Sequence, residues 1–284
     1  MSRAADLSPL SQLMRRVDAV SDGAPPPDTV STGFPSLDRL LGGGVRLGDL
    51  VVLGGDTASG KSALALAVAL RVAQERNGAG AAFFSGEMSA ERVMERVLAI
   101  EGRARVDDLR RGTLDEGTRA GVGAAALRMR DVLPIVDVIP DGGLEAIEAE
   151  LDGSAVRLAV IDPLQGLLPG TRHPEEEAAA AIVRLKALAR RLRVAVLATA
   201  ALPGLRPDRG DARPRLDDFG ALGAVKQHAD VVLGLFREEM YQTQGAEGAT
   251  EVLALKNRNG ATGYVDLYFY KQWMRFEDML DPDR

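Results

Sequence analysis

Short apolar runs alternate with longer segments of helical spacing along most of the 284-residue chain. The runs have the length and composition of strands buried in a parallel sheet, and the longer segments are typical of helices. Strands are predicted at 49–53, 81–85, 134–139, 158–162, 194–199, 231–236, 251–257 and 263–270. Helices are predicted at 35–41, 62–70, 90–100, 144–151 and 175–193, with further helical segments between 105 and 130. This alternation predicts an α/β fold built on a doubly wound, mostly parallel sheet.

The two ends of the chain depart from this pattern. Asn259-Gly260, between the last two strands, is a strong signal for a C-terminal β-hairpin. Near the N-terminus Ser8 suits a helix cap, and apolar residues recur on one face of a helix predicted at 8–20. The polar, Pro-rich segment 21–29 has the composition of a stiff tether. So short a helix needs a packing partner, either its own domain or a neighbouring subunit, and the tether favours the neighbour.

Composition and charge exclude several classes of protein. The chain has no Cys, which excludes a disulfide framework and a thiolate metal site, and its two isolated histidines, His173 and His228, argue against a His-based metal site. No apolar run approaches the ~18 residues of a membrane span, and the N-terminus lacks the order of a signal peptide, so we expect a cytoplasmic protein without a membrane partner. A net charge of −6 argues against a broadly basic nucleic-acid coat but allows a local basic channel.

The most informative motif is Gly-x-x-x-x-Gly-Lys-Ser, between the first apolar strand and the helix that follows it. Such a phosphate loop points backbone N–H groups at the β-phosphate of a nucleoside triphosphate, beside the positive end of the new helix. Lys61 can then reach the β- and γ-phosphates, and the Ser62 hydroxyl can ligate Mg²⁺. The predicted nucleotide-binding residues are Gly55, Asp56, Thr57, Ala58, Ser59, Gly60, Lys61 and Ser62.

Two acidic residues follow predicted strands, where ligands collect in an open α/β sheet. Asp162 ends an apolar strand, which is the pattern of the acid that holds Mg²⁺ through water, although an Asp before Pro163 also suits the start of a turn. Glu87 follows the strand at 81–85, which we expect to lie beside the strand that carries the phosphate loop. A carboxylate there can orient and polarise the water that attacks the γ-phosphate. The alternative is an acid at a helix start, near the predicted Ser89 cap.

Lys256 and Arg258 place two cations close to the tip of the predicted hairpin. Such a tip can project from one subunit into the active site of the next, where a guanidinium stabilises the charge of the transferring phosphoryl group, as an arginine finger does. The alternative is a solvated turn. These residues alone leave both interpretations open.

From about Val30 to Asp283 the chain resembles the RecA-like motor domain of the DnaB-type replicative, hexameric helicases. Besides the phosphate loop, the stretches that carry the resemblance are 31–38, 84–89, 160–165, 227–230, 256–260 and 272–276. Their shared order over most of the chain makes the match specific. The resemblance implies a RecA-like P-loop NTPase fold for residues 30–284 and a linker helix with its tether at 1–29.

The resemblance also implies an activity and an assembly. It implies a Mg²⁺-dependent ATP hydrolase that forms a ring, expected to be a hexamer, and binds single-stranded DNA. Glu87 is similar to the catalytic glutamate of these helicases, and Lys256 and Arg258 are similar to the cations that reach the neighbouring subunit's nucleotide. The helix at 8–20 is similar to the linker helix that docks on an adjacent motor.

The chain departs from the helicase pattern at several places. The N-terminal helical domain of the family is expected to be absent. Ala201 stands where these helicases usually carry a Gln proposed to couple the γ-phosphate to the DNA loops, and Gly220-Ala221-Leu222 replaces a usual Arg-Glu-Ser. The segment 37–56 also resembles the RadA-type recombination ATPases. A helicase-type DNA motor is therefore the first hypothesis, and an ATP-hydrolysing regulatory or assembly protein that does not unwind DNA is the second.

The Pro- and Gly-rich segment 203–218 is the candidate DNA-binding loop of the motor hypothesis, because basic side chains there can hold phosphates in a central channel. Its basic residues are Arg206, Arg209, Arg213 and Arg215. Asp208, Asp211, Asp217 and Asp218 almost cancel that charge. A solvated loop is therefore a serious alternative, and any binding of single-stranded DNA is expected to be weak.

Overall fold

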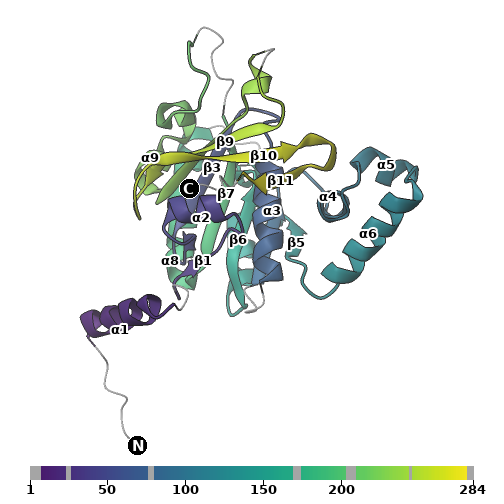
Figure 1. Cartoon of the computed structure of the whole chain (residues 1–284). Helices are drawn as coiled ribbons and strands as arrows, with labels where there is room; N and C mark the ends of the chain where they lie inside the picture. Colours follow the sequence, from purple (N-terminus) through teal and green to yellow (C-terminus); the bar gives the residue numbers. More distant parts are fainter. Residues whose placement is uncertain are drawn as a thin grey trace, which may run out of the picture.

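A nine-stranded sheet lies at the centre of the described part of the chain, with helices on both faces (Figure 1). The computed structural model describes residues 8–23, 27–75, 80–168, 174–202, 209–242 and 245–279. Across the sheet the strands are β11 (Arg275–Asp278), β10 (Gly263–Tyr270), β9 (Ala249–Asn257), β8 (Val231–Phe236), β3 (Leu50–Gly55), β7 (Ala195–Ala201), β6 (Val156–Asp162), β4 (Gly80–Ser85) and β5 (Ile135–Val138). Neighbours from β8 to β5 run parallel, and the pairs β8–β9, β9–β10 and β10–β11 are antiparallel. The short strands β1 (Thr29–Val30) and β2 (Val45–Arg46) form a separate antiparallel pair.

The helices build a hydrophobic core on each face of the sheet. One core contains α2 (Pro35–Leu41), α3 (Lys61–Gln74) and α4 (Ala90–Gly102), and the other contains α7 (Gly143–Leu151), α8 (Pro174–Leu192), α9 (Ala224–His228) and the 3₁₀ helix η2 (Leu216–Leu222). α5 (Val106–Arg111) and α6 (Glu116–Met129) extend from α4, and α1 (Pro9–Ser21) lies apart from the sheet (Figure 1). The remaining 3₁₀ helices are η1 (Leu164–Leu167), η3 (Glu238–Met240) and η4 (Lys271–Trp273). None of the described helices combines the length and the apolar character that a membrane crossing requires.

The predicted α/β class with a mostly parallel, doubly wound sheet is confirmed, and each predicted strand and helix is present with small shifts at its ends. Two expected helix caps are also present, because the Ser8 hydroxyl accepts from the Ser11 N–H at 3.2 Å and the Ser89 hydroxyl from the Arg92 N–H at 3.4 Å. The C-terminal hairpin forms between β9 and β10, which are joined by residues 258–262. The strand β11 and the β1–β2 pair were not predicted.

The predicted place of β4 in the sheet is wrong. β4, the strand that Glu87 follows, is separated from the phosphate-loop strand β3 by both β7 and β6. The reason is the path of α3, which packs across β7, β6 and β4, so the chain re-enters the sheet beyond the two intervening strands. Consecutive strands are often neighbours, and nothing in the local sequence signals this longer crossover.

The phosphate loop and the β9–β10 hairpin tip lie at opposite ends of the parallel strands. β3 ends at Gly55, beside Ala201 at the end of β7, and this end carries the phosphate loop. β9 runs antiparallel to β8, so its last residue Asn257 pairs with Val231, the first residue of β8. The tip of the β9–β10 hairpin therefore lies at the opposite end of the sheet from the phosphate loop, roughly 16 Å away at ~3.3 Å for each step along β3.

Candidate nucleotide-binding site

The phosphate-loop motif adopts the predicted strand–loop–helix arrangement, from the end of β3 at Gly55 to the start of α3 at Lys61. Both of its glycines are required by the backbone. Gly60 has φ of 105°, a region that favours glycine. A Cβ atom on Gly55 would lie 2.8 Å from the Ser59 hydroxyl and 3.0 Å from the Leu235 carbonyl, so the loop closes too tightly for any side chain there.

The inside of the loop presents donors that suit an anion. The Lys61 ammonium donates to the Asp56 carbonyl at 2.7 Å, and burial lowers the pKa of Lys61, with the carboxylates of Asp162, Asp56 and Glu87 opposing that shift. The Ser59 hydroxyl is buried and has no hydrogen-bond partner among the described residues. The first N–H groups of α3 lack partners within the helix. An orphaned hydroxyl, a lysine and a helix N-terminus around one loop fit the phosphates of a nucleotide.

Asp162 brings two hydroxyl groups to the end of β6. Its Oδ1 accepts from the Ser62 hydroxyl at 2.9 Å and from the Thr199 hydroxyl at 2.5 Å, and the Asp162 residue is only 3% exposed. A carboxylate in contact with the loop Ser is the donor set that Mg²⁺ bound to nucleotide phosphates uses. Thr199 was missed in the sequence, although it is the only polar residue of the buried strand β7 and could have been noticed for that reason.

Glu87 reaches the same edge of the sheet in spite of the wrong strand order. Ser85, the last residue of β4, pairs with Asp162, and the Gly86 N–H donates to the Asp162 carbonyl at 2.8 Å. Glu87 directly follows this hydrogen-bonded glycine. It is exposed and makes no hydrogen bond or ion pair to any described residue. Its charge acts on Lys61, so both lie in one electrostatic cluster.

Arg96 on α4 is a member of this cluster that the sequence analysis missed. Burial lowers the pKa of Arg96, while the carboxylates of Asp162 and Glu87 oppose that shift. The side chain is half-buried and makes no hydrogen bond or ion pair within the described ranges. Its signal was its position three residues after Val93 and beside Val97, which places a charged residue on the inward face of the helix.

A second group of missed residues closes the loop from the side of β8. The Arg237 guanidinium, whose side chain is 8% exposed, donates to the Ala58 carbonyl at 3.3 Å and pairs with Glu239 at 2.6 Å. The Tyr241 hydroxyl donates to the Asp56 carboxylate at 3.0 Å, and burial, with this carboxylate, raises the pKa of Tyr241. These side chains lie in and beside η3, directly after β8, the strand that pairs with β3 on the side opposite β7, and they contact the outer side of the phosphate loop.

Lys256 and Arg258 do not lie near the phosphate loop of their own chain. The Lys256 ammonium donates to the carbonyls of Lys226 and Ala229 at 2.7 and 2.6 Å, at the C-terminal end of α9. Burial lowers the pKa of Lys256, and the neighbouring Arg258 lowers it further, partly opposed by Asp230. The Arg258 guanidinium, whose side chain is 49% exposed, pairs with Asp230 at 3.1 Å. Both cations lie at the hairpin end of the sheet, so neither reaches this chain's own phosphate loop.

Comparison with known proteins assigns the family. Residues 29–278 match the family model of the DnaB-like helicase C-terminal domain. The chain belongs to this family. It is 32% identical over 259 residues to the replicative DNA helicase DnaB of Geobacillus stearothermophilus, a match that covers 88% of this chain and 56% of that protein. The chain thus spans a little over half of that DnaB helicase.

Solved structures show the same fold in this family and outside it. A structure of a DnaB-like replicative helicase, described together with its interactions with primase, superposes with a TM-score of 0.84 at 23% identity, over 95% of this chain and 66% of that one. The KaiC-like protein PH0186 from Pyrococcus horikoshii OT3 superposes with a TM-score of 0.61 at 18% identity, over 87% of this chain and 97% of that one. The RecA-like architecture is therefore shared with proteins that are not described as helicases.

Two of the three described arginines of the candidate DNA-binding loop form ion pairs within the chain. Arg209 pairs with Asp218 at 2.6 Å, and Arg213 pairs with Glu251 at 2.5 Å, while Arg215 is exposed. Arg206 lies outside the described residues. The two paired carboxylates offset the positive charge that Arg209 and Arg213 could offer to nucleic-acid phosphates.

Proposed function

We propose that this chain is the motor domain of a DnaB-like helicase that hydrolyses Mg²⁺-ATP between identical subunits of a ring. The observation that carries the proposal is the cluster at the strand ends: Lys61 in a closed phosphate loop, Ser62 on Asp162, and Glu87 beside them. No other arrangement of titratable groups in the described residues combines a phosphate cradle, a cation-binding pair and an unpaired carboxylate.

The roles within the site follow from these positions. Lys61 and the loop N–H groups hold the phosphates, and Ser62 with Asp162, the latter through water, would hold Mg²⁺, which neutralises charge on the β- and γ-phosphates when bound. Glu87 orients the attacking water and accepts its proton, because its carboxylate is exposed and is not engaged by any described residue. The test is phosphate release against Mg²⁺ concentration. Wild-type protein should require Mg²⁺, Lys61→Ala should lose ATP binding, and Mg²⁺-independent turnover would refute the metal role.

The active site is completed by a second subunit in this proposal. Arg258 lies at the opposite end of the sheet from its own phosphate loop, so a guanidinium that serves as a finger must serve the loop of a neighbour. Lys256 is a second candidate, although its ammonium already donates two hydrogen bonds to α9. An interface that joins opposite ends of one molecule is heterologous, and such an interface forms a ring when its rotation closes; we propose a closed ring of six subunits.

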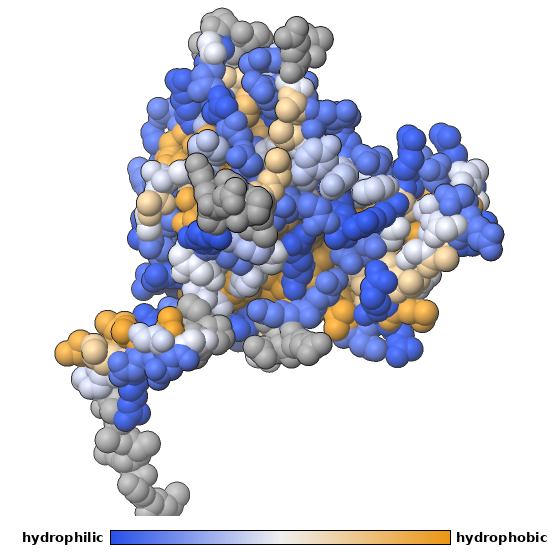
Figure 2. All heavy atoms as spheres, viewed as in Figure 1, coloured by the Kyte–Doolittle hydropathy of each residue, from blue (hydrophilic) through white to orange (hydrophobic). Residues whose placement is uncertain are grey.

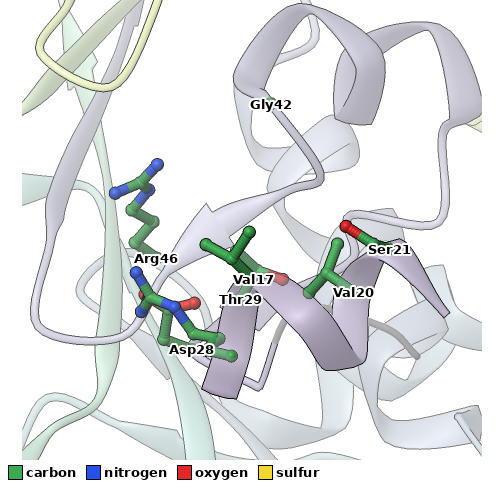
Figure 3. A pocket seen from close by; sticks show the side chains of 8 residues that line it. Val17, Val20, Ser21, Asp28, Thr29, Gly42 and Arg46 are labelled. Carbon is green, nitrogen blue, oxygen red and sulfur yellow. The ribbon is translucent and has the colours of Figure 1, made fainter. Parts of the chain in front are cut away.

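The apolar face of α1 supports the same assembly. Its apolar residues are exposed by 38–67%, and they are Leu10, Leu13, Met14, Val17 and Val20 (Figure 2). A pocket of about 240 Å³ lies between α1 and the β1–β2 pair, with Val17 and Val20 on one side and Thr29 and Arg46 on the other (Figure 3). Val17 and Val20 thus face the body of their own chain only across an open pocket, and the apolar face as a whole stays exposed. Further exposed apolar side chains lie on α6, on β5 and just before β5, and they are Leu127, Leu133, Ile135 and Val138.

A mixing experiment tests the shared site. Arg258→Ala removes the finger and keeps the loop, and Lys61→Ala removes the loop function and keeps the finger. Each variant alone should be almost inactive, because an arginine finger contributes about 10³–10⁵ in rate. In mixed rings some interfaces combine an intact loop with an intact finger, so activity should return. Full activity of a strictly monomeric protein would refute the shared site.

A second candidate function is an ATP-hydrolysing regulatory or assembly protein that does not unwind DNA. Two observations favour it: Ala201 gives the strand end beside Gly55 no polar side chain, and two arginines of the candidate DNA loop are paired with carboxylates. The ATPase rate against single-stranded DNA, at two salt concentrations and on rings, separates the candidates. A motor should be stimulated, with binding that weakens steeply as salt rises. No binding and no stimulation at low salt would leave the regulatory function.

A further inference from the structure

Asp230 is a buried carboxylate that joins three elements at the hairpin end of the sheet. The residue is 5% exposed and lies directly before β8. Its Oδ2 accepts from the Leu50 N–H at 2.9 Å and lies 2.5 Å from the ammonium of Lys186 on α8. Its Oδ1 accepts from the Arg258 guanidinium at 3.1 Å. Every contact of the carboxylate therefore ends on a donor, and one of these donors is the candidate finger.

The backbone around Asp230 leaves it little freedom to move. The Asp230 N–H donates to the Leu50 carbonyl at 2.9 Å, and the Arg258 N–H donates to the Asp230 carbonyl at 2.9 Å. Lys186 is fixed in turn by the Gly48 carbonyl at 2.7 Å and by the Asp49 carboxylate at 3.6 Å. The carboxylate is thus held at a set position relative to the first residue of β3.

Two hydrogen bonds within the chain hold the guanidinium of Arg258. Its Nη1 donates to Asp230, and its Nη2 donates to the Gln227 carbonyl near the end of α9 at 2.6 Å. A guanidinium has five N–H donors, of which these two bonds use two, and the Arg258 side chain is 49% exposed. One edge of the guanidinium is therefore fixed to the protein while other donors face outward, which is the arrangement needed to present it to a ligand outside the chain.

We infer that Asp230, together with the last carbonyls of α9, is the positioning site for the finger that serves the neighbouring subunit's nucleotide. This inference rests on the proposed function of Arg258. Asp230 does not touch the nucleotide; it fixes where the guanidinium stands relative to the sheet. Such placement matters because a shift of about 1 Å in a positioned catalytic group can cost about 10²-fold in rate.

Asp230→Asn is the central variant, because it keeps the shape of the side chain and removes its charge. Turnover at saturating ATP should fall by about 10–10²-fold, with little change in the KM for ATP. Lys186→Met is the matched control: it removes the other cation that contacts Asp230 and leaves the Arg258 contact in place. Its turnover per ring should stay within about threefold of wild type, even where its melting temperature falls as much as that of Asp230→Asn.

Mixed rings separate a finger defect from a general structural defect. Asp230→Asn subunits retain a working phosphate loop, so they should regain activity when mixed with Lys61→Ala subunits, which supply intact fingers. In a random one-to-one ring about a quarter of the interfaces have this combination. Asp230→Asn mixed with Arg258→Ala should stay inactive, because both subunits lack a working finger. In an Arg258→Ala background, Asp230→Asn should lower turnover no further.

Three results would overturn the inference: turnover of Asp230→Asn within about threefold of wild type, no recovery with Lys61→Ala, or an additive loss in the double variant. Failure of Arg258→Ala and Lys61→Ala to complement each other would instead refute the finger itself. If Asp230→Asn does not fold because Lys186 loses the nearer of its two carboxylate partners, Asp230→Asn combined with Lys186→Met removes both charges together. That double variant should show the same loss of turnover and the same recovery with Lys61→Ala.

Discussion

Replacing Glu87 by Gln is the sharpest test of the hydrolysis mechanism. The carboxylate is exposed and makes no hydrogen bond or ion pair to a described residue, so the amide should change the free energy of unfolding by less than about 0.5 kcal/mol. Turnover should fall by about 10²–10⁴-fold, the usual contribution of a positioned base, which corresponds to about 3–5 kcal/mol in the barrier. ATP affinity should stay equal or increase, because the substitution removes a negative charge close to Lys61 and the phosphates.

Three measurements separate these effects: phosphate release at saturating ATP, calorimetric ATP binding, and thermal melting. Glu91→Gln is the matched control, since Glu91 is an exposed acid in the first turn of α4, four residues further along the chain. It should leave turnover unchanged. Glu87→Gln with near wild-type turnover would refute its role as the base. A tenfold loss of ATP affinity would show that Glu87 acts in binding instead.

Three further outcomes follow from single contacts. Arg96→Met should lower turnover by about 10²-fold at unchanged ring size, because it removes the guanidinium beside Asp162 and Glu87; an unchanged rate would show that Arg96 only balances these charges. Tyr241→Phe should weaken ATP binding by a few fold in calorimetry, since it loses a hydrogen bond of about 0.5–1.5 kcal/mol at the phosphate loop. Leu13→Glu should convert rings to smaller species in native mass spectrometry without lowering the melting temperature, and equal dissociation by Arg15→Glu, outside the apolar face, would refute docking through that face.

The phosphate loop could be predicted because its chemistry is contiguous in the sequence. β3, the loop and α3 are adjacent segments, and the backbone geometry that the motif requires is specified by Gly55 and Gly60 themselves. Asp162 was predicted by a rule that is also local, an acid at the end of an apolar strand. Such local predictions hold whatever the order of the strands, because all parallel strands have their carboxyl ends at the same edge of the sheet.

What could not be predicted depends on which strands become neighbours. Thr199, Arg237 and Tyr241 join the site because β7 and β8 lie beside β3, and no local pattern specifies that order. The same limit explains the wrong neighbour assigned to β4. Glu87 reaches the site because β4 pairs with β6, whose end carries Asp162. Asp230 was recognised as part of a motif, but its contact with Arg258 requires the antiparallel return of β9 along β8.

The strand end at Ala201 explains why fold and family together do not decide between a motor and a regulatory ATPase. A polar side chain there would stand beside Gly55 and link the nucleotide to the segment that follows β7. The chain instead makes this link through the backbone and through packing. The Leu202 N–H donates to the Gly55 carbonyl at 3.0 Å, and the Phe219 ring packs so close to Gly54 that a Cβ there would lie 2.5 Å from it. Leu202 and Phe219, on the two sides of the candidate DNA loop, thus both contact β3, and among the described residues the side chain that hydrogen-bonds the Ala201 backbone is Gln165 of η1, at 3.0 Å to the carbonyl. If the chain is a motor, ATP must therefore act on the DNA loop through these contacts or through the interface between subunits, and the DNA-stimulation assay tests whether it does.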